Sequence, residues 1–184
     1  MTIKRPPQPT ADGKWPVTIT FLAMEERHRI PALPPPLESH AIIRAENPTV
    51  SFYRYLYDAV GRDWAWVDRK RLSDSELEAI ITSPSTEIYV LYIQGVPAGF
   101  AELNTAGLPE VVDLAYFGIM PEFIGRKLGP YLLSWAVEEA WLNEPERVTV
   151  NTCTLDHPKA LPLYQRFGFQ PIRQQEIEID PVEE

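Results

Sequence analysis

A basic, glycine-bearing loop is the first feature of this sequence whose residue types suit a chemical task. It lies within residues 117–133, between a β-rich stretch and an apolar stripe at helical spacing. The first turn of a helix presents unpaired N–H groups, Gly125 and Gly129 allow close backbone approach, and the basic pair Arg126 and Lys127 adds positive charge. These properties suit a pyrophosphate group. The composition suits an ordinary strand-to-helix turn with solvated basic side chains equally well.

The single cysteine and the three histidines are candidate nucleophiles and metal ligands. Cys153 could be a nucleophile activated by His157, but no orienting Asn or Asp and no nucleophile-bearing turn accompanies them, so a buried thiol is favoured. His28 and His40 lack metal-ligand spacing and are interpreted as surface residues. The sequence therefore predicts neither thiol catalysis nor a metal site.

Hydrophobic spacing and turn residues predict the elements that must position the loop. Ser73 and Glu76 form a capping-box pattern that begins one helix, and Pro84 prevents its continuation. The strand–helix–strand unit requires a parallel pair, so the order of elements predicts an α+β fold with a mixed sheet. The expected strands are 17–22, 87–93, 98–103, 111–119, 147–155 and 169–179, and the expected helices are 49–61, 73–83, 128–140 and 158–167.

The loop resembles the acetyl-coenzyme A (acetyl-CoA) signature of the GNAT superfamily of N-acetyltransferases. In that family a strand ends two residues before a proline, and a Gln/Arg-x-x-Gly-x-Gly/Ala loop opens the next helix. The matching stretch here is Ile124-Gly125-Arg126-Lys127-Leu128-Gly129. Its last glycine agrees, whereas isoleucine replaces Gln or Arg and lysine replaces the first signature glycine. An added cation near phosphates would offset the less favourable backbone geometry of lysine.

A second stretch, residues 155–169, resembles the family pattern Asn-x-x-Ala-x-x-x-Tyr-x-x-x-Gly-Phe more specifically. The residues that agree in identity and spacing are Ala160, Tyr164, Gly168 and Phe169. His157 stands where the family has Asn. The resemblance covers about residues 86–170, and the N-terminal half is similar to a bacterial subgroup without an agreed substrate. It implies a GNAT-like mixed central sheet flanked by helices and splayed between the fourth and fifth expected strands, 111–119 and 147–155.

The resemblance implies direct attack of a neutral amine on the thioester of acetyl-CoA. Tyr164 matches the family's general acid, although by spacing alone an aromatic residue on a short helix is more often part of the core. Asp113 and Glu102, on neighbouring strands, are alternative general bases, and a water without a dedicated base is the third option. The other implied acetyl-CoA contacts are the backbone of Phe117, Gly118 and Ile119, the loop Ile124, Gly125, Arg126, Lys127, Leu128, Gly129 and Pro130, and the side chain of His157.

Two further expectations concern side-chain placement. Strict alternation along 111–119 places Asp113 on the same face as Phe117 and Ile119. Trp64 and Trp66 could wall an acceptor pocket or cover the core, and core packing is favoured.

Composition sets limits on partners and location. The chain of 184 residues is 45% hydrophobic, so we expect one domain over 1–184, with a Pro-rich segment at 1–48 and a cofactor-binding core at 86–170. The net charge of −9 disfavours a nucleic-acid partner, and no apolar run approaches the length of a membrane helix. With one cysteine and no apolar signal-peptide core, a cytoplasmic protein is expected.

Other functions remain open on these residues. The leading hypothesis is acetyl transfer to a primary amine of a small molecule or peptide. A GNAT-like domain with a weakened loop could instead bind acyl-CoA without turnover, or the Pro-rich segment and aromatic helix could bind another protein. A homodimer through the last strand is also open, because Ile177 and Ile179 alternate there, although neighbouring acidic residues would discourage pairing.

Overall fold

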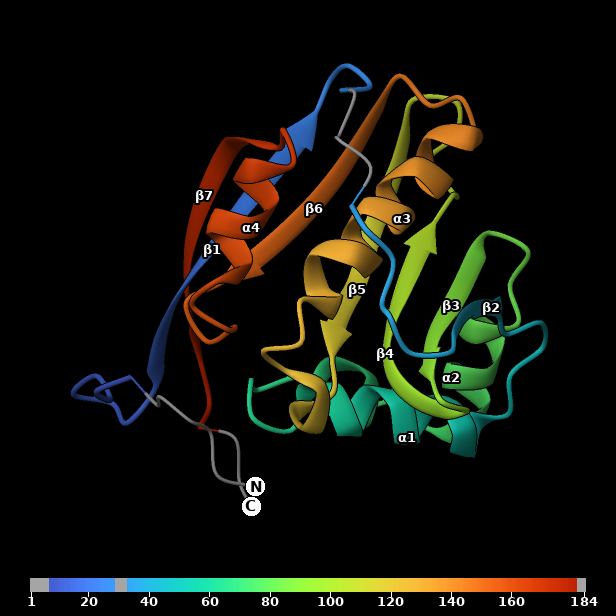
Figure 1. Ribbon diagram of the computed structural model, residues 1–184. Coiled ribbons are helices and arrows are strands. Elements are labelled where there is room, and N and C mark those ends of the chain that lie inside the picture. Colours follow the sequence, from blue (N-terminus) through green and yellow to red (C-terminus); the bar gives the residue numbers. More distant parts are fainter. Residues whose placement is uncertain (1–6, 29–32, 182–184) are drawn as a thin grey trace.

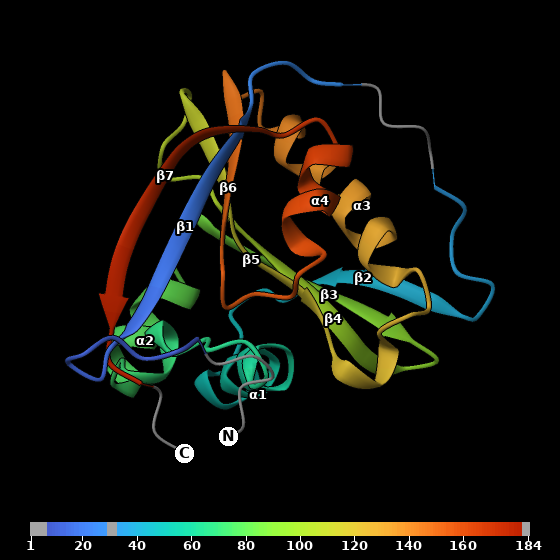
Figure 2. The ribbon, with the colours of Figure 1, turned by 90° about the vertical axis from the view of Figure 1, so that its left-hand side faces the viewer.

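The computed structural model describes residues 7–28 and 33–181 and shows a mixed sheet with helices on both faces (Figures 1 and 2). Parts of the expected domain 1–184, including residues 1–6 and 29–32 of its Pro-rich segment and 182–184, lie outside the described residues. In the described part, the sheet has the strand order β2-β3-β4-β5-β6-β1-β7. The strands are β1 (Trp15–Met24), β2 (His40–Arg44), β3 (Thr86–Ile93), β4 (Val96–Asn104), β5 (Val111–Ile119), β6 (Arg147–Cys153) and β7 (Gln170–Ile179). The helices are α1 (Val50–Gly61), α2 (Asp74–Ile81), α3 (Leu128–Leu142) and α4 (Ala160–Arg166), with 3-10 turns η1 (Asp68–Lys70) and η2 (Pro121–Phe123).

The predicted helices and strands are present, and local signals set several of their ends. Thr49 caps α1 by accepting a hydrogen bond from the Phe52 N–H, and Ser73 and Glu76 form the predicted capping box of α2. Strand β2 was not predicted. Its five residues follow a Pro-rich stretch, and pairing with β3 is what makes them a strand.

The N-terminal strand β1 lies inside the sheet and far from β2, the next strand in sequence. It pairs antiparallel with β6 on one side and with β7 on the other. Strands β2 and β7 are therefore the edges of the described sheet. This confirms that the last strand is an edge, with most of its residues exposed. Pairing of that edge with a second copy of the chain stays a prediction.

Two apolar layers cover the two faces of the sheet. Helices α3 and α4 cover one face, in a cluster that includes Leu133, Val137 and Tyr164. Helices α1 and α2 cover the other face, around Tyr53 and Leu77. Figure 2 shows the two helix pairs on opposite sides of the sheet. Within residues 7–28 and 33–181, no helix is long and apolar enough to cross a bilayer.

The sheet splits between β5 and β6, as the family resemblance implied. The two strands pair in parallel only over Val111–Leu114 and Arg147–Val150. Beyond these residues they diverge, because β5 continues in register with β4 and β6 continues in register with β1 (Figure 1). Since β5 and β6 run parallel, their carboxyl ends both lie at the open end of this split.

Candidate active site

The carboxyl half of β5 lies open to the split. Residues 115–119 are all only half-buried, although β5 is a central strand. The Met120 N–H donates a hydrogen bond to the Ala98 carbonyl. In an antiparallel ladder every second residue directs both its N–H and its C=O group toward the neighbouring strand, so Met120 and Gly118 direct these groups toward β4. Phe117 and Ile119 are the intervening residues. Their N–H and C=O groups therefore face the split, where an extended ligand can pair with them.

Gly118 is held against α1. Its ladder partner is Phe100 of β4, so its backbone groups point away from the split. A Cβ atom built at Gly118 would overlap the Cγ1 of Val60 and lie 3.7 Å from the Trp66 ring. Close helix–strand packing therefore requires glycine here. This geometry favours Phe117 and Ile119 as the backbone contacts for a ligand, and a contact to Gly118 stays a prediction.

The loop between β5 and α3 presents backbone donors at the open end of the split. Within the described ranges, no backbone carbonyl accepts a hydrogen bond from the N–H groups of residues 125–129. Gly125 (φ 90°) and Lys127 (φ 61°) both adopt the left-handed conformation. Pro130 lies in the first turn of α3 and has no N–H to add. The arrangement suits a bound phosphate group, because unpaired N–H groups at a helix start attract anions.

Lys127 is strained in this loop, and we expect Lys127→Gly to stabilise the protein. A residue with a Cβ at φ 61° and ψ 16° is destabilised by about 1–2 kcal/mol through steric overlap. Glycine removes this overlap, but its greater conformational entropy in the unfolded chain offsets part of the gain. The expected gain is about 0.5–1 kcal/mol, or a rise in melting temperature of about 1–4 °C. Lys127→Ala is the control, because it removes the charge and keeps the Cβ. A glycine variant no more stable than the alanine variant would contradict the strain.

Arg126 is already paired with an acidic residue. Its guanidinium donates to the Glu38 carboxylate at 2.6 Å and lies over the Phe123 ring, 5.0 Å from the centroid. Both partners of the ion pair are more than one third exposed, and the arginine lowers the pKa of Glu38. Arg126, which is expected to bind a phosphate, is therefore already paired with a carboxylate from the segment that precedes β2.

Tyr164 lies on α4 and packs against the split. Only 5% of the residue is exposed, and its ring makes edge contacts with Phe117 at 6.2 Å and with Phe169 at 6.1 Å. Burial, reinforced by the negative charge of Asp156, raises the pKa of the Tyr164 phenol. The phenol therefore stays protonated at neutral pH, which suits a proton donor.

Glu102 is a buried and fully engaged carboxylate. It lies on β4 opposite Tyr116 and is 1% exposed. One oxygen accepts a hydrogen bond from the Tyr53 hydroxyl, and the other accepts one from the Arg69 guanidinium at 2.7 Å. Burial raises the pKa of Glu102, and the positive charge of Arg69 opposes this rise. Its partners lie on the α1 side of the sheet, whereas Tyr164 lies on the α3–α4 side.

Asp113 lies in the part of the sheet where β5 and β6 are still paired. Its neighbour on β6 is Thr149, whose hydroxyl donates to the Asp113 carboxylate at 2.6 Å. Burial raises the pKa of this carboxyl group. The structure thus does not bring Asp113 and Tyr164 together at the open end of the split.

A β-bulge in β5 corrects the expected alternation of side chains. The register between β4 and β5 shifts at Ala115, which has no partner on β4. As a result, Leu114 and Phe117 pack in the same cluster beneath α3. The prediction that Asp113 shares a face with Phe117 is wrong, because the extra residue turns the later side chains over.

The loop after α1 bridges the split, a feature that no sequence pattern indicated. Trp66 packs against Tyr116 of β5, with ring centroids 5.3 Å apart, and its indole N–H donates to Asp156 at 3.3 Å. Asp156 lies three residues beyond the end of β6. Trp66 also contacts the core around α1, so it both packs against the core and borders the open end. Trp64 lies edge-on to His157 at 5.0 Å.

A family model for the acetyltransferase (GNAT) family matches residues 53–169, which is more than half of the chain. The chain belongs to the GNAT family. Both diverging strands, the loop before α3, and Tyr164 lie within the matched residues. The GNAT domain makes this protein an acyltransferase.

Solved structures share the GNAT fold. A GNAT-family protein from Novosphingobium aromaticivorans DSM 12444 has a TM-score of 0.61 at 17% identity, over 92% of this chain and 69% of its own. The tandem GNAT protein from the clavulanic acid biosynthesis pathway has a TM-score of 0.59 at 19% identity, over 90% of this chain and 55% of its own. A GNAT acetyltransferase from Streptococcus pneumoniae TIGR4 has a TM-score of 0.53 at 20% identity, over 72% of this chain and 88% of its own.

These likenesses, at 20% identity or less, show the fold alone. The chain spans only part of the length of the first two proteins. No curated protein matches it.

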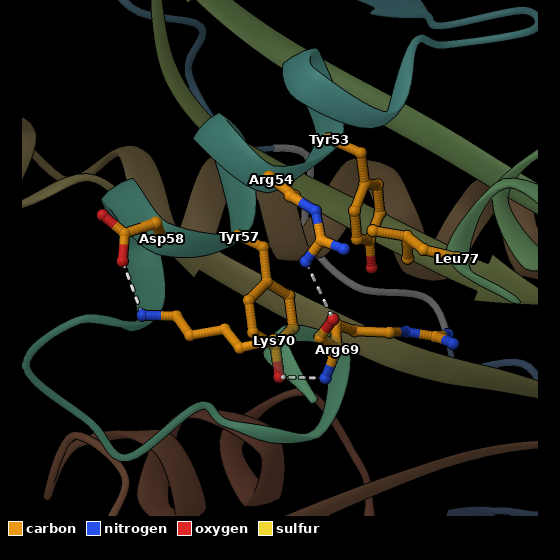
Figure 3. Close-up of a pocket in the computed structure, with 7 residues that line it drawn as sticks. All are labelled: Tyr53, Arg54, Tyr57, Asp58, Arg69, Lys70 and Leu77. Carbon is orange, nitrogen blue, oxygen red and sulfur yellow. Dashed lines mark hydrogen bonds and ion pairs between the residues drawn. The ribbon is translucent and has the colours of Figure 1, made fainter. Parts of the chain in front are cut away.

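This GNAT chain has a cavity of about 220 Å³ between α1, η1 and α2 (Figure 3). The cavity is lined by Tyr53, Arg54, Tyr57, Asp58, Arg69, Lys70 and Leu77. Its basic residues are compensated: Lys70 pairs with Asp58 at 2.5 Å, Arg54 with Asp74 at 2.8 Å, and Arg69 with Glu102. The cavity lies on the face of the sheet opposite Tyr164, so it is separated from the proposed proton donor.

The Cys153 thiol is half-buried beside Asp156 in this GNAT structure. Burial and the nearby negative charge of Asp156 raise the pKa of its thiol to about 12. The thiol is therefore protonated at neutral pH, in agreement with the sequence interpretation. In the ranges that the structure describes, no group of three or more His, Cys, Asp or Glu residues could hold a metal ion.

Proposed function

We propose that this chain transfers an acetyl group from acetyl-CoA to a primary amine of a small molecule or peptide by direct attack. The observation that carries the proposal is the split between β5 and β6. The backbone groups of Phe117 and Ile119 face it, unpaired N–H groups lie at its open end, and Tyr164 packs beside it. An extended pantetheine chain would pair with the strand edge, and the pyrophosphate would lie at the start of α3.

The proposed roles follow from the needs of the reaction. The nitrogen attacks the thioester carbonyl, the C–N bond forms and the C–S bond breaks. A backbone N–H of β5 would polarise the carbonyl oxygen as negative charge develops, and Tyr164 would protonate the leaving thiolate. Glu102 has both oxygens engaged and Asp113 lies in the paired part of the sheet, so we favour water as the immediate acceptor of the amine proton.

The proposal is tested by two measurements on the wild-type chain. Calorimetry measures acetyl-CoA binding, and release of coenzyme A is followed with glucosamine, tyramine, spermidine and lysine amide. We expect micromolar binding and turnover of at least one amine. Binding without turnover of any amine would support the non-catalytic acyl-CoA-binding alternative. Absence of binding at millimolar acetyl-CoA would exclude both and leave a protein-interaction domain.

Glu38→Gln should tighten acetyl-CoA binding, because it releases Arg126 for the phosphates. Exposed ion pairs are weak and are screened by salt, so the expected gain is about two- to fivefold at low salt and smaller at high salt. Calorimetry at two salt concentrations measures it. Glu122→Gln is the control, since it removes an equal charge from η2 in the same loop. If the two variants gained equally, the Glu38–Arg126 contact would have no special effect.

A further inference from the structure

Asp156 is a carboxylate at the open end of the split that the mechanism above leaves unused. Its Oδ2 accepts hydrogen bonds from the Thr152 hydroxyl at 2.8 Å and from the Cys153 N–H at 2.9 Å. Its Oδ1 accepts one long bond, from the Trp66 indole at 3.3 Å. A carboxylate can accept about four hydrogen bonds. Oδ1 therefore keeps capacity for another donor.

The negative charge of Asp156 is not compensated within the described part of the chain. None of the ion pairs between described residues includes it. Glu102, by contrast, is paired with Arg69 at 2.7 Å. Asp156 is half-buried, and a carboxylate partly withdrawn from water gains when a cation approaches it. This position thus favours a positively charged ligand.

Asp156 also lines a cavity of about 190 Å³ together with hydroxyl groups. Thr18, Thr20, Thr152 and Thr154 contribute to its wall. This volume is smaller than the 300–1,000 Å³ of sites that bind drug-sized ligands, so the cavity can hold only one end of a ligand. Leu161 also lines the cavity, and it belongs to α4, the helix that carries Tyr164.

We propose that Asp156 binds the ammonium group of the acceptor and that the threonine hydroxyls contact polar substituents beside it. The substrate class is then a small, polar primary amine. This inference rests on the proposed acetyl transfer, because an ammonium bound here lies beyond the paired residues of β5 and β6 and beside the helix that carries Tyr164. The overall charge of −9 would also draw such cations toward the protein.

The test compares Asp156→Asn with the wild type, using glucosamine and tyramine as probes. Amine binding is measured by calorimetry on protein saturated with coenzyme A, so that no turnover is needed. Loss of a charge-assisted hydrogen bond should weaken amine binding about 10- to 100-fold, with coenzyme A affinity unchanged. Asp12→Asn is the matched variant, because it removes an equal charge from an exposed turn outside the cavity. We expect it to weaken amine binding less than threefold.

A second measurement needs no folded variant: the wild type should bind glucosamine and tyramine at least tenfold more tightly than their neutral analogues glucose and 4-ethylphenol. Equal binding within these pairs, or equal losses in Asp156→Asn and Asp12→Asn, would overturn the inference. Failure of every probe to bind the wild type would overturn it as well. Amine binding that depends on Asp156 without any turnover would uphold this site and reject the proposed reaction.

Discussion

Tyr164→Phe should lower kcat for acetyl transfer by about 100- to 1,000-fold, because the leaving thiolate loses its proton donor. The ring and its contacts with Phe117 and Phe169 remain, so the melting temperature and acetyl-CoA affinity should change little. The measurement is coenzyme release with the best amine of the panel. Calorimetry on the same variant measures acetyl-CoA affinity.

Tyr131→Phe is the control for this prediction. Tyr131 is a half-buried tyrosine on α3 whose ring lies edge-on to His40 at 5.5 Å, so the change also removes a phenol and keeps a ring contact. We expect its kcat to stay within about threefold of the wild type. A Tyr164→Phe variant that retains wild-type kcat would show that Tyr164 only packs in the core.

Arg69→Met should destabilise the protein by about 3 kcal/mol, because it leaves Glu102 buried without its cation. For a chain of this length, the melting temperature should fall by about 6–12 °C. Arg62→Met is the control. Arg62 caps the carboxyl end of α1, its side chain is 48% exposed and it approaches Asp58 only to 4.0 Å, so its loss should change stability by at most about 0.5 kcal/mol.

The pH dependence of this variant separates charge from packing. Burial raises the pKa of Glu102 in the folded state and Arg69 lowers it, so removal of Arg69 raises it further. A carboxyl with a raised pKa favours folding at low pH and costs stability as the pH rises through that pKa. The deficit of Arg69→Met should therefore be larger at pH 8 than at pH 5. An equal deficit at both pH values would assign the loss to packing over the Tyr116 ring.

Local features of this chain were predictable because their causes lie within a few residues. The capping box of Ser73 and Glu76 pairs groups one helical turn apart, and the apolar stripe of α3 is set by helical spacing alone. The two sequence motifs, at residues 124–129 and 155–169, identified the family. They also predicted correctly that the basic loop precedes a helix and that Tyr164 lies on a short helix. The left-handed conformation of Lys127 followed from its position in the signature, where glycine is usual.

Pairings between segments far apart in the sequence determined the strand order and the contacts around the split. Residues more than 120 positions apart join β1 to β6, and no local signal in Trp15–Met24 indicates either of its partners. The bulge at Ala115, the partner of Glu102 and the contact between Trp66 and Asp156 likewise exist only because the sheet brings distant segments together. The sequence by itself determined the helices, the basic glycine-bearing loop before α3 and the family. The tertiary structure decided which carboxylates are neutralised and which one faces the open end, because burial and charge pairing depend on neighbours that are remote in the chain.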